Sequence, residues 1–413
     1  MDRIKENKNI LIVSQYFWPE NFRVNELVLA LKKRGYTIEV LTTIPNYPSG
    51  RVFPEYSSDP SKYNDYYGIK VHRVWQITRF NNKLTLVLNY LSFVLTASLY
   101  SLIKLRRKKF DMIFGIQLSP IFSMIPAILL KKILRKPLYF WVLDIWPDSI
   151  YGAGIKSLFV HNVLRRLCVR IYSSADILFL SSNGFKTKLK KMRVLSPKLI
   201  YLPNWIESDY EDSIPLGSLE DKKISEIMSA WKNKVIFTFT GNIGEAQDFP
   251  TLLRALKKCA NIKNIVILLI GEGRYKSELV KKIKDQNLEN VVICLDQYPS
   301  KYMSLFYNYS SYLFLSLKDT PVFSYTLPGK IQSYMSSGKP IVGIVNGESA
   351  KVIDEANCGF TVPSGNCDEL ALIIDKCCFL DGKEKQKLGN NGLNYANEFF
   401  KLDSILDKVL KHF

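Results

Sequence analysis

Short apolar runs alternate along the chain with longer segments in which apolar residues recur at helical spacing. Residues 9–14 and 38–43 are runs of strand length, and between them residues 24–35 carry leucines at helical spacing and end at Gly35. Continuous apolar runs of this length are typical of parallel strands that helices cover on both faces. The start of the chain therefore predicts a β-α-β unit of a doubly wound sheet.

The second half of the chain repeats this alternation. Apolar runs of strand length recur there, and each ends in glycine or polar residues, at 234–240, 265–270, 291–295, 312–317 and 341–345. Strands that alternate with helical segments predict a second parallel sheet. We therefore expect two α/β domains, each built around its own sheet.

A boundary between these domains is predicted where the alternation stops. Segment 207–220 is acidic and lacks periodicity, which is typical of a domain linker. We therefore predict a first domain over 1–204 and a second over 205–390. Residues 391–413 have the pattern of a terminal helix, which we expect to cross back to the first domain.

Composition and charge narrow the class of protein. The 413 residues are 47% hydrophobic and 23% charged, as in a folded chain large enough for two cores. The formal charge of +19 implies an anionic partner, which is a nucleic acid, a membrane surface or a phosphorylated ligand. Seven cysteines without CxxC spacing and only three histidines argue against a disulfide framework or a zinc site, and favour a reducing cytoplasm.

The segment 84–105 is apolar over the length of a membrane span, and the basic cluster 106–109 follows it. It also contains Asn89 and Lys104, and a strand pattern follows at once. We predict a helix that packs partly on the first domain and partly on an anionic bilayer surface, which makes the protein peripheral on the membrane over 84–109. A transmembrane helix and a wholly buried helix are the two alternatives.

Lys330 is the centre of a candidate phosphate site. Pro328 and Gly329 open a predicted helix that ends at Gly338, so Lys330 falls in its first turn, where an ammonium and backbone N–H groups favour an anion. The alternative is an ordinary helix–strand unit with a solvated lysine. The phosphate site is favoured by the strand-end loops that a parallel sheet gathers at the same edge, namely 241–248, 271–274 and 296–299.

Polar residues also follow two predicted strands of the first half. Asp144 ends the run 138–144 and Asp148 lies in the loop after it, where a carboxylate is placed for acid–base chemistry, although Asp148 could instead cap a helix. Glu20, Asn21 and Arg23 follow the first strand, where ligands of such sheets bind. For each of Glu20, Asn21 and Arg23 the alternative is a loop residue without a chemical role.

Four loops carry a resemblance to a known family. These are Gly241-Asn242-Ile243-Gly244-Glu245-Ala246-Gln247, Pro203-Asn204-Trp205, Trp141-Val142-Leu143-Asp144-Ile145-Trp146-Pro147-Asp148 and Tyr16-Phe17-Trp18-Pro19-Glu20. Together with Met335-Ser336-Ser337-Gly338-Lys339-Pro340-Ile341-Val342, they resemble glycosyltransferase family 4 over essentially the whole chain. Within it the chain looks like the bacterial surface-polysaccharide branch, and is most similar to the O-antigen L-fucosamine (N-acetyl-L-fucosamine) transferases.

The resemblance implies a GT-B fold, in which two Rossmann-like domains face a cleft. It implies retaining transfer of a sugar from a nucleotide sugar, UDP-linked, to a polyprenyl-diphosphate-linked acceptor at the cytoplasmic face of the membrane, without a metal or another cofactor. The second domain would bind the donor through Gly241, Asn242, Gly244, Glu245, Gln247, Gly271, Glu272, Arg274, Gln297, Tyr298, Pro328, Gly329 and Lys330. The acceptor side would include Glu20, Asn21, Arg23 and Asp148, and the catalytic residues would be Asp144 and Lys330.

The chain departs from the family pattern at two places. Many members carry two glutamates where this chain has Tyr325 and Ser333, so the ribose contact of the second glutamate must be made otherwise. Many also carry an Arg–Lys pair where this chain has Asn242 and Gln247, which leaves Lys330, backbone amides and either Arg274 or the first-domain Arg23 to meet the diphosphate charge. A sugar-nucleotide epimerase of the same fold is the alternative enzyme, and a basic nucleic-acid-binding protein is the alternative outside enzymes.

Overall fold

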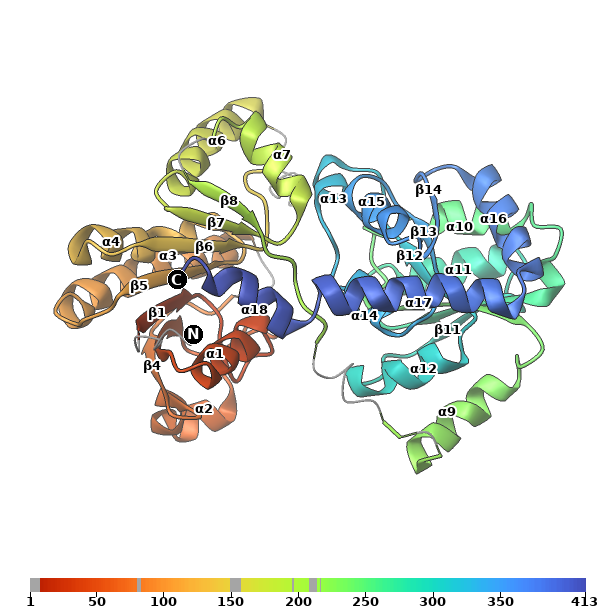
Figure 1. Cartoon of the computed structure of the whole chain (residues 1–413), viewed down its shortest axis with the longest axis horizontal. Helices are drawn as coiled ribbons and strands as arrows, with labels where there is room; N and C mark the ends of the chain where they lie inside the picture. Colours follow the sequence, from red (N-terminus) through yellow and green to blue (C-terminus); the bar gives the residue numbers. More distant parts are fainter. Residues whose placement is uncertain (1–7, 80–82, 149–156, 195–196, 208–213, 216) are drawn as a thin grey trace, which may run out of the picture. The chain divides into compact units, whose positions relative to one another are not determined.

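The computed structural model describes residues 8–79, 83–148, 157–194, 197–207, 214–215 and 217–413. The contacts within the chain divide it into two units (Figure 1). Unit 1 contains Met1–Leu202 and Leu410–Phe413, and unit 2 contains Pro203–Val409.

Unit 1 is built on an eight-stranded sheet of order β3-β4-β2-β1-β5-β6-β7-β8. All neighbouring strands pair in parallel except β3 with β4. The strands are β1 Asn9–Ser14, β2 Thr37–Thr43, β3 Asp65–Tyr66, β4 Ile69–Val74, β5 Met112–Gln117, β6 Leu138–Val142, β7 Ile177–Leu180 and β8 Lys198–Tyr201. The apolar stretch of β1 is fully buried, because the sheet is covered on both faces.

Helices connect the strands of unit 1. They are α1 Arg23–Lys33, α2 Pro54–Ser58, α3 Lys83–Tyr100, α4 Ile125–Leu134, α6 Leu158–Tyr172 and α7 Asn183–Lys191. The side chains of Ser157 and Ser182 cap the first turns of α6 and α7 by accepting hydrogen bonds from backbone N–H groups. A π-helical turn, Ser101–Leu105, continues α3, and short 3-10 helices lie at Pro60–Asn64 and Ile121–Met124.

The apolar helix α3 is attached to the sheet along one stripe. This buried stripe recurs every four residues and contains Asn89, Phe93, Ala97 and Ser101, which are fully buried. The helix therefore packs on unit 1 along this stripe. The opposite stripe is exposed and apolar, so a wholly buried helix is wrong. Its members are Leu84, Val87, Leu88, Leu91, Leu95, Leu99, Leu102 and Ile103.

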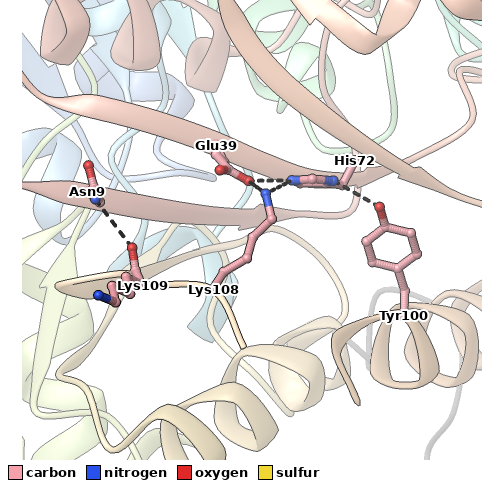
Figure 2. A network of polar contacts seen from close by, with 6 residues as sticks. All are labelled: Asn9, Glu39, His72, Tyr100, Lys108 and Lys109. Carbon is pink, nitrogen blue, oxygen red and sulfur yellow. Dashed lines mark hydrogen bonds and ion pairs between the residues drawn. The ribbon is translucent and has the colours of Figure 1, made fainter. Parts of the chain in front are cut away.

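A polar network fixes the end of this helix (Figure 2). The Lys108 ammonium lies 2.5 Å from a Glu39 carboxylate oxygen, His72 Nε2 lies 2.5 Å from the same oxygen, and the Tyr100 hydroxyl lies 2.9 Å from His72 Nδ1. Lys108 therefore points back to strand β2, and only its neighbours in the basic cluster 106–109 are exposed.

Unit 2 is built on a six-stranded parallel sheet of order β11-β10-β9-β12-β13-β14. The strands are β9 Val235–Thr240, β10 Ile265–Ile270, β11 Val292–Leu295, β12 Tyr312–Ser316, β13 Ile341–Ile344 and β14 Gly359–Val362. Alternate residues of β9 enter two separate cores, with Phe237 and Phe239 in one and Ile236 in the other. The sheet is thus covered on both faces, as the continuous apolar runs predict.

The helices of unit 2 precede and follow these strands. They are α9 Leu219–Ser229, α10 Phe249–Leu256, α11 Lys276–Asp285, α12 Met303–Tyr309, α13 Pro321–Tyr325, α14 Lys330–Ser336, α15 Glu348–Glu355, α16 Cys367–Phe379 and α17 Gly382–Phe399, with α18 Leu402–Leu410 at the end of the chain. Short 3-10 helices lie at Ile262–Asn264 and Ser300–Tyr302.

The terminal segment differs from the single helix predicted over 391–413. The helix is interrupted at Phe400 and Lys401, between α17 and α18, because the Phe400 backbone leaves helical geometry and its buried ring packs into the core of unit 2. Beyond α18, the His412 carbonyl accepts a hydrogen bond from the Tyr139 hydroxyl at 2.9 Å, and the Phe413 ring lies 5.7 Å from that of Phe114, both within unit 1.

Candidate functional site

A cavity of about 550 Å³ lies in unit 2, at the carboxyl ends of β9, β10 and β11. This is the edge at which parallel sheets bind ligands. It is lined by Thr240, Gly241, Asn242, Ile270, Gly271, Glu272, Gly273, Gln297, Tyr298, Pro299, Ser300, Met303, Tyr307, Lys330 and Ser333. The volume falls in the range of small-molecule sites.

Two glycines allow the loops under this cavity to approach each other. Gly271 has φ +148°, and a Cβ atom there would lie 2.0 Å from the Gly241 carbonyl oxygen. Gly241 has φ +113°, and a Cβ atom there would lie 2.8 Å from Lys330 Cε. Larger residues at either position would strain the backbone and displace the neighbouring loop or the lysine. The glycines therefore set the floor of the cavity and the position of Lys330.

Lys330 begins α14 and extends over the loop that follows β9. Its Nζ lies 3.8 Å from the centroid of the buried Phe239 ring, in a cation–π arrangement. Burial lowers the pKa of Lys330 to about 7. None of the ion pairs found among the described residues involves Lys330. A cation that burial disfavours, placed in a cavity, is suited to a ligand that brings negative charge.

Buried side chains hold the loops around Lys330. The Tyr334 hydroxyl accepts a hydrogen bond from the Thr240 N–H at 3.0 Å, and the Tyr307 hydroxyl lies 2.8 Å from Thr240 Oγ1. With its amide nitrogen turned toward the loop, the buried Gln332 donates to the carbonyls of Pro328 and Gly329 at 3.0 and 2.9 Å. These contacts position the end of β9 and the start of α14 against each other.

The structure places seven of the predicted donor residues on this cavity. They are Gly241, Asn242, Gly271, Glu272, Gln297, Tyr298 and Lys330. Gly244, Glu245, Gln247, Arg274, Pro328 and Gly329 lie in the same loops but do not line it. The Gln247 amide oxygen accepts from the Gly244 N–H at 2.9 Å, so this buried side chain braces the loop, whereas Glu245 and Arg274 are exposed.

The cavity also uses residues that the sequence pattern did not single out. Met303 and Tyr307 line it from α12, whose apolar spacing resembles that of any core helix. Ser333, which the sequence marked only as a departure from the family pattern, lines it as well, and its hydroxyl donates weakly to the Gly329 carbonyl at 3.4 Å. Glu272 pairs with Lys276 at 2.5 Å, and Lys276 also pairs with Asp296 at 2.9 Å, which ties two of the lining loops together.

In unit 1, the two aspartates after β6 have different surroundings. Asp144 is half-buried, and its carboxylate accepts a hydrogen bond from Trp146 Nε1 at 3.1 Å. Asp148 is buried and is paired with Lys188 and with His161, whose Nε2 lies 3.5 Å away. Asp148 thus links the end of β6 to α6 and α7. The residues that it would cap, 149 onward, lie outside the described part of the chain.

The three residues predicted after β1 also differ from one another in burial and contacts. The buried Glu20 carboxylate accepts from the N–H groups of Phe17, Asn46 and Tyr47 at 3.3, 2.8 and 2.6 Å, so it organises two loops. Burial raises the pKa of Glu20, although the three hydrogen bonds oppose this. Asn21 is exposed, and Arg23 starts α1 and is half-buried.

Comparisons with known proteins extend this picture. Residues 221–395 match the family described as Glycosyl transferases group 1. The probable glycosyltransferase WbjE of Pseudomonas aeruginosa is 30% identical over 270 residues, which cover 62% of this chain and 65% of that protein. The match therefore spans just under two thirds of that relative.

A second relative is an enzyme of Campylobacter jejuni named N-acetylgalactosamine-N,N'-diacetylbacillosaminyl-diphospho-undecaprenol 4-alpha-N-acetylgalactosaminyltransferase. It is 30% identical over 163 residues, 38% of this chain and 40% of that protein. Among solved structures, Anabaena HepE in complex with UDP aligns over 98% of this chain and 99% of that chain, with a TM-score of 0.68 and 17% identity. The two parallel-sheet units and this likeness establish the GT-B fold, and the sequence matches support a glycosyltransferase.

Proposed function

We propose that this protein is a retaining glycosyltransferase that moves a sugar from a UDP-sugar to a lipid-linked acceptor in the assembly of a bacterial surface polysaccharide. The observation that carries the proposal is the cavity of unit 2, with a half-buried lysine and two glycine loops at the carboxyl edge of a parallel sheet. The HepE structure, which contains UDP, supports a uridine nucleotide as the donor carrier.

The charge in the cavity suits the departure of a diphosphate. Breaking the sugar–phosphate bond places negative charge on the leaving diphosphate and positive character on the sugar. Lys330 and the N–H groups of the Gly241 loop are fixed in place before reaction, so they can stabilise this charge without reorganising. In a retaining reaction the leaving phosphate could itself take the proton of the acceptor hydroxyl, with Asp144 orienting the acceptor.

A lipid-linked acceptor is supported by the Campylobacter relative, whose name specifies a sugar carried by diphospho-undecaprenol. We propose a polyprenyl-diphosphate-linked sugar as the acceptor class and N-acetyl-L-fucosamine as the transferred sugar. The second assignment rests on the resemblance of the loops that contain Asp144, Gly241 and Asn204 to the O-antigen enzymes.

We also propose that the protein is peripheral on the cytoplasmic face of the membrane and binds through α3. Leu84–Leu105 is the one helix, among the described residues, that is long and apolar enough to cross a membrane. Its buried stripe packs on unit 1, and its exposed stripe carries leucines such as Leu91 and Leu95, 58% and 61% exposed. Residues 83–110 contain no aspartate or glutamate, so the helix fits the boundary of an anionic bilayer.

The donor site is tested by replacing Lys330. We expect Lys330→Met to weaken UDP-sugar binding about 10- to 100-fold, because a charge-assisted contact to the diphosphate is worth roughly 1.5–3 kcal/mol. Thermal-shift titration against a panel of UDP-sugars measures this and identifies the sugar. Turnover should fall at least as far.

Lys339→Met is the matched control. Lys339 is also half-buried with a lowered pKa due to burial, but its Nζ donates to the Asn308 carbonyl at 2.8 Å and does not line the cavity. Equal UDP-sugar binding by the Lys330 variant and wild type would remove the proposed role of Lys330. Conversion of the UDP-sugar to its epimer in the absence of any acceptor would instead identify an epimerase.

A further inference from the structure

An arginine that the sequence patterns left unremarked lies against tyrosines at the carboxyl edge of the unit 1 sheet. Arg79 follows β4, and its guanidinium carbon lies 4.5 Å from the centroid of the Tyr47 ring, in the loop after β2. Arg79 also donates a hydrogen bond to the Tyr90 hydroxyl, which comes from α3. Three segments distant in sequence thus hold one guanidinium.

Aromatic rings form a wall beside Arg79. The Tyr16 and Phe22 rings are nearly parallel, with centroids 5.4 Å apart, and Tyr47 lies 5.3 Å from Tyr16. Tyr16 is buried and donates to the Asn89 side chain at 3.3 Å, so the residue before Tyr90 in α3 is tied to the same wall. The rings of this wall therefore pack against one another and against α3, and the guanidinium lies over the Tyr47 ring.

Two carboxylates, Glu20 and Asp144, lie near this edge. No ion pair found among the described residues involves Arg79. Glu20 uses its oxygens on three backbone N–H groups, as described above. Asp144 is near enough to affect Tyr90, whose pKa is raised mainly by burial and further by Asp144, whereas Arg79 lowers it.

Arg73, in β4, is an arginine with a structural role, and its contacts can be compared with those of Arg79. Its guanidinium N–H groups donate to the carbonyls of Tyr63, Thr43 and Trp18, so its donors are used within the fold. Among the described residues, Arg79 instead lies over the Tyr47 ring and donates to the Tyr90 hydroxyl. A stacked guanidinium keeps its planar N–H edge available for two parallel hydrogen bonds to phosphate oxygens.

We infer that Arg79, with Tyr47 and Tyr90, binds a phosphate group that joins the acceptor sugar to its lipid. This inference rests on the proposed function. Tyr90 and Leu91 are neighbours in α3, and Tyr90 contacts Arg79 while Leu91 belongs to the exposed apolar stripe. A phosphate at Arg79 therefore lies beside a helix that offers its other face to lipid chains. The same chemistry could be met by the headgroup of a bulk anionic phospholipid, so the test separates these sources.

The probes are farnesyl diphosphate and farnesol, titrated calorimetrically into the full chain in non-ionic detergent. We expect wild type to bind the diphosphate more tightly, and Arg79→Gln to lose about 10- to 100-fold of that affinity with farnesol binding unchanged. Arg79→Lys should retain part, since it keeps the charge but not the planar fork. Arg166→Gln, which removes an exposed arginine of α6, should bind as wild type.

A second experiment measures binding to phosphatidylcholine vesicles that contain phosphatidylglycerol, and it tests whether Arg79 binds the headgroups of bulk phospholipid. We expect Arg79→Gln to bind these vesicles as wild type does. Loss of vesicle binding with intact farnesyl diphosphate binding would assign Arg79 to bulk headgroups and overturn the inference. Equal losses for the diphosphate and farnesol, or no loss for either, would overturn it as well.

UDP binding by unit 2 and the unfolding temperature report whether each variant is folded. A different result would refute the proposed transferase activity, namely that wild type binds no UDP-sugar and transfers no sugar. Selective loss of farnesyl diphosphate binding in a folded Arg79→Gln protein would support the phosphate site even in that case.

Discussion

The burial of Lys330 predicts that donor binding depends on pH. Its pKa of about 7, due to burial, means that the ammonium is half-deprotonated near neutral pH in the empty cavity. A bound diphosphate favours the charged form and raises this pKa. Binding above pH 7 must therefore take up a proton, and affinity should fall as pH rises, by up to about tenfold per unit.

Calorimetry at pH 8 in two buffers of different ionisation enthalpy measures this proton uptake. A UDP-sugar is the right ligand, because its diphosphate is a diester and does not titrate in this range. We expect uptake approaching one proton for wild type and none for Lys330→Arg, since a guanidinium stays charged. Buffer-independent heats for wild type would contradict the assignment.

The same residue should reduce the stability of the empty protein. Because the folded-state pKa is below that of an unfolded lysine, the unfolded chain binds more protons between about pH 7 and 10, and stability rises with pH over this window. Lys330→Met removes the cost of burying the cation. We expect its Tm to exceed that of wild type at pH 7, by roughly 2–4 °C for each kcal/mol relieved, and by less at pH 9. A lower Tm than wild type at both pH values would contradict this.

At the scale of elements, α3 is the part whose environment the sequence left open. A helix pattern over 84–105 was evident, but three surroundings were compatible with it. The alternation of a buried stripe through Phe93 with an exposed stripe through Leu95 excludes the wholly buried one. The sequence could not show that Lys108 differs from its basic neighbours, because its partner Glu39 lies 69 positions earlier, in β2.

We expect Leu91→Ser with Leu95→Ser to weaken binding to anionic vesicles by at least tenfold, because each leucine buried in the bilayer boundary contributes roughly 1.5–3 kcal/mol. The matched control is Leu372→Ser with Phe379→Ser in α16 of unit 2, which are 72% and 76% exposed. Co-sedimentation measures both. Equal binding by the two double variants would remove α3 as the membrane contact.

The charges after α3 should act separately from its leucines. Neutralising Arg106, Arg107 and Lys109 should weaken binding to anionic but not to neutral vesicles, by about 1 kcal/mol for each charge at low salt. Lys108 should be left in place, because it pairs with Glu39 inside unit 1. Burial would raise the pKa of Glu39, but hydrogen bonds from Lys108 and His72 outweigh it and lower this pKa, so the pair contributes stability that is lost as pH falls.

For the whole molecule, the sequence was sufficient for the repeated α/β alternation and for the main loops of the cavity. Apolar runs mark the strands, and their ends place Gly241, Gly271 and Lys330 at one edge by topology alone. The site proposed at Arg79, Tyr47 and Tyr90 could not be predicted, because Tyr47 follows β2, Arg79 follows β4 and Tyr90 lies within α3, and no local spacing joins them. The helix break at Phe400 was missed for a similar reason, since tertiary packing overrides a continuous helical pattern there.

The division into two units leads to one further expectation. Every residue that lines the 550 Å³ cavity belongs to Pro203–Val409, and both of that unit's cores are formed within it. A fragment of residues 203–409 should therefore fold and bind UDP within about tenfold of the full chain, while transferring no sugar, because the proposed acceptor residues are absent. Circular dichroism and calorimetry check folding and UDP binding. A folded fragment that does not bind UDP would mean that the nucleotide site needs groups outside unit 2.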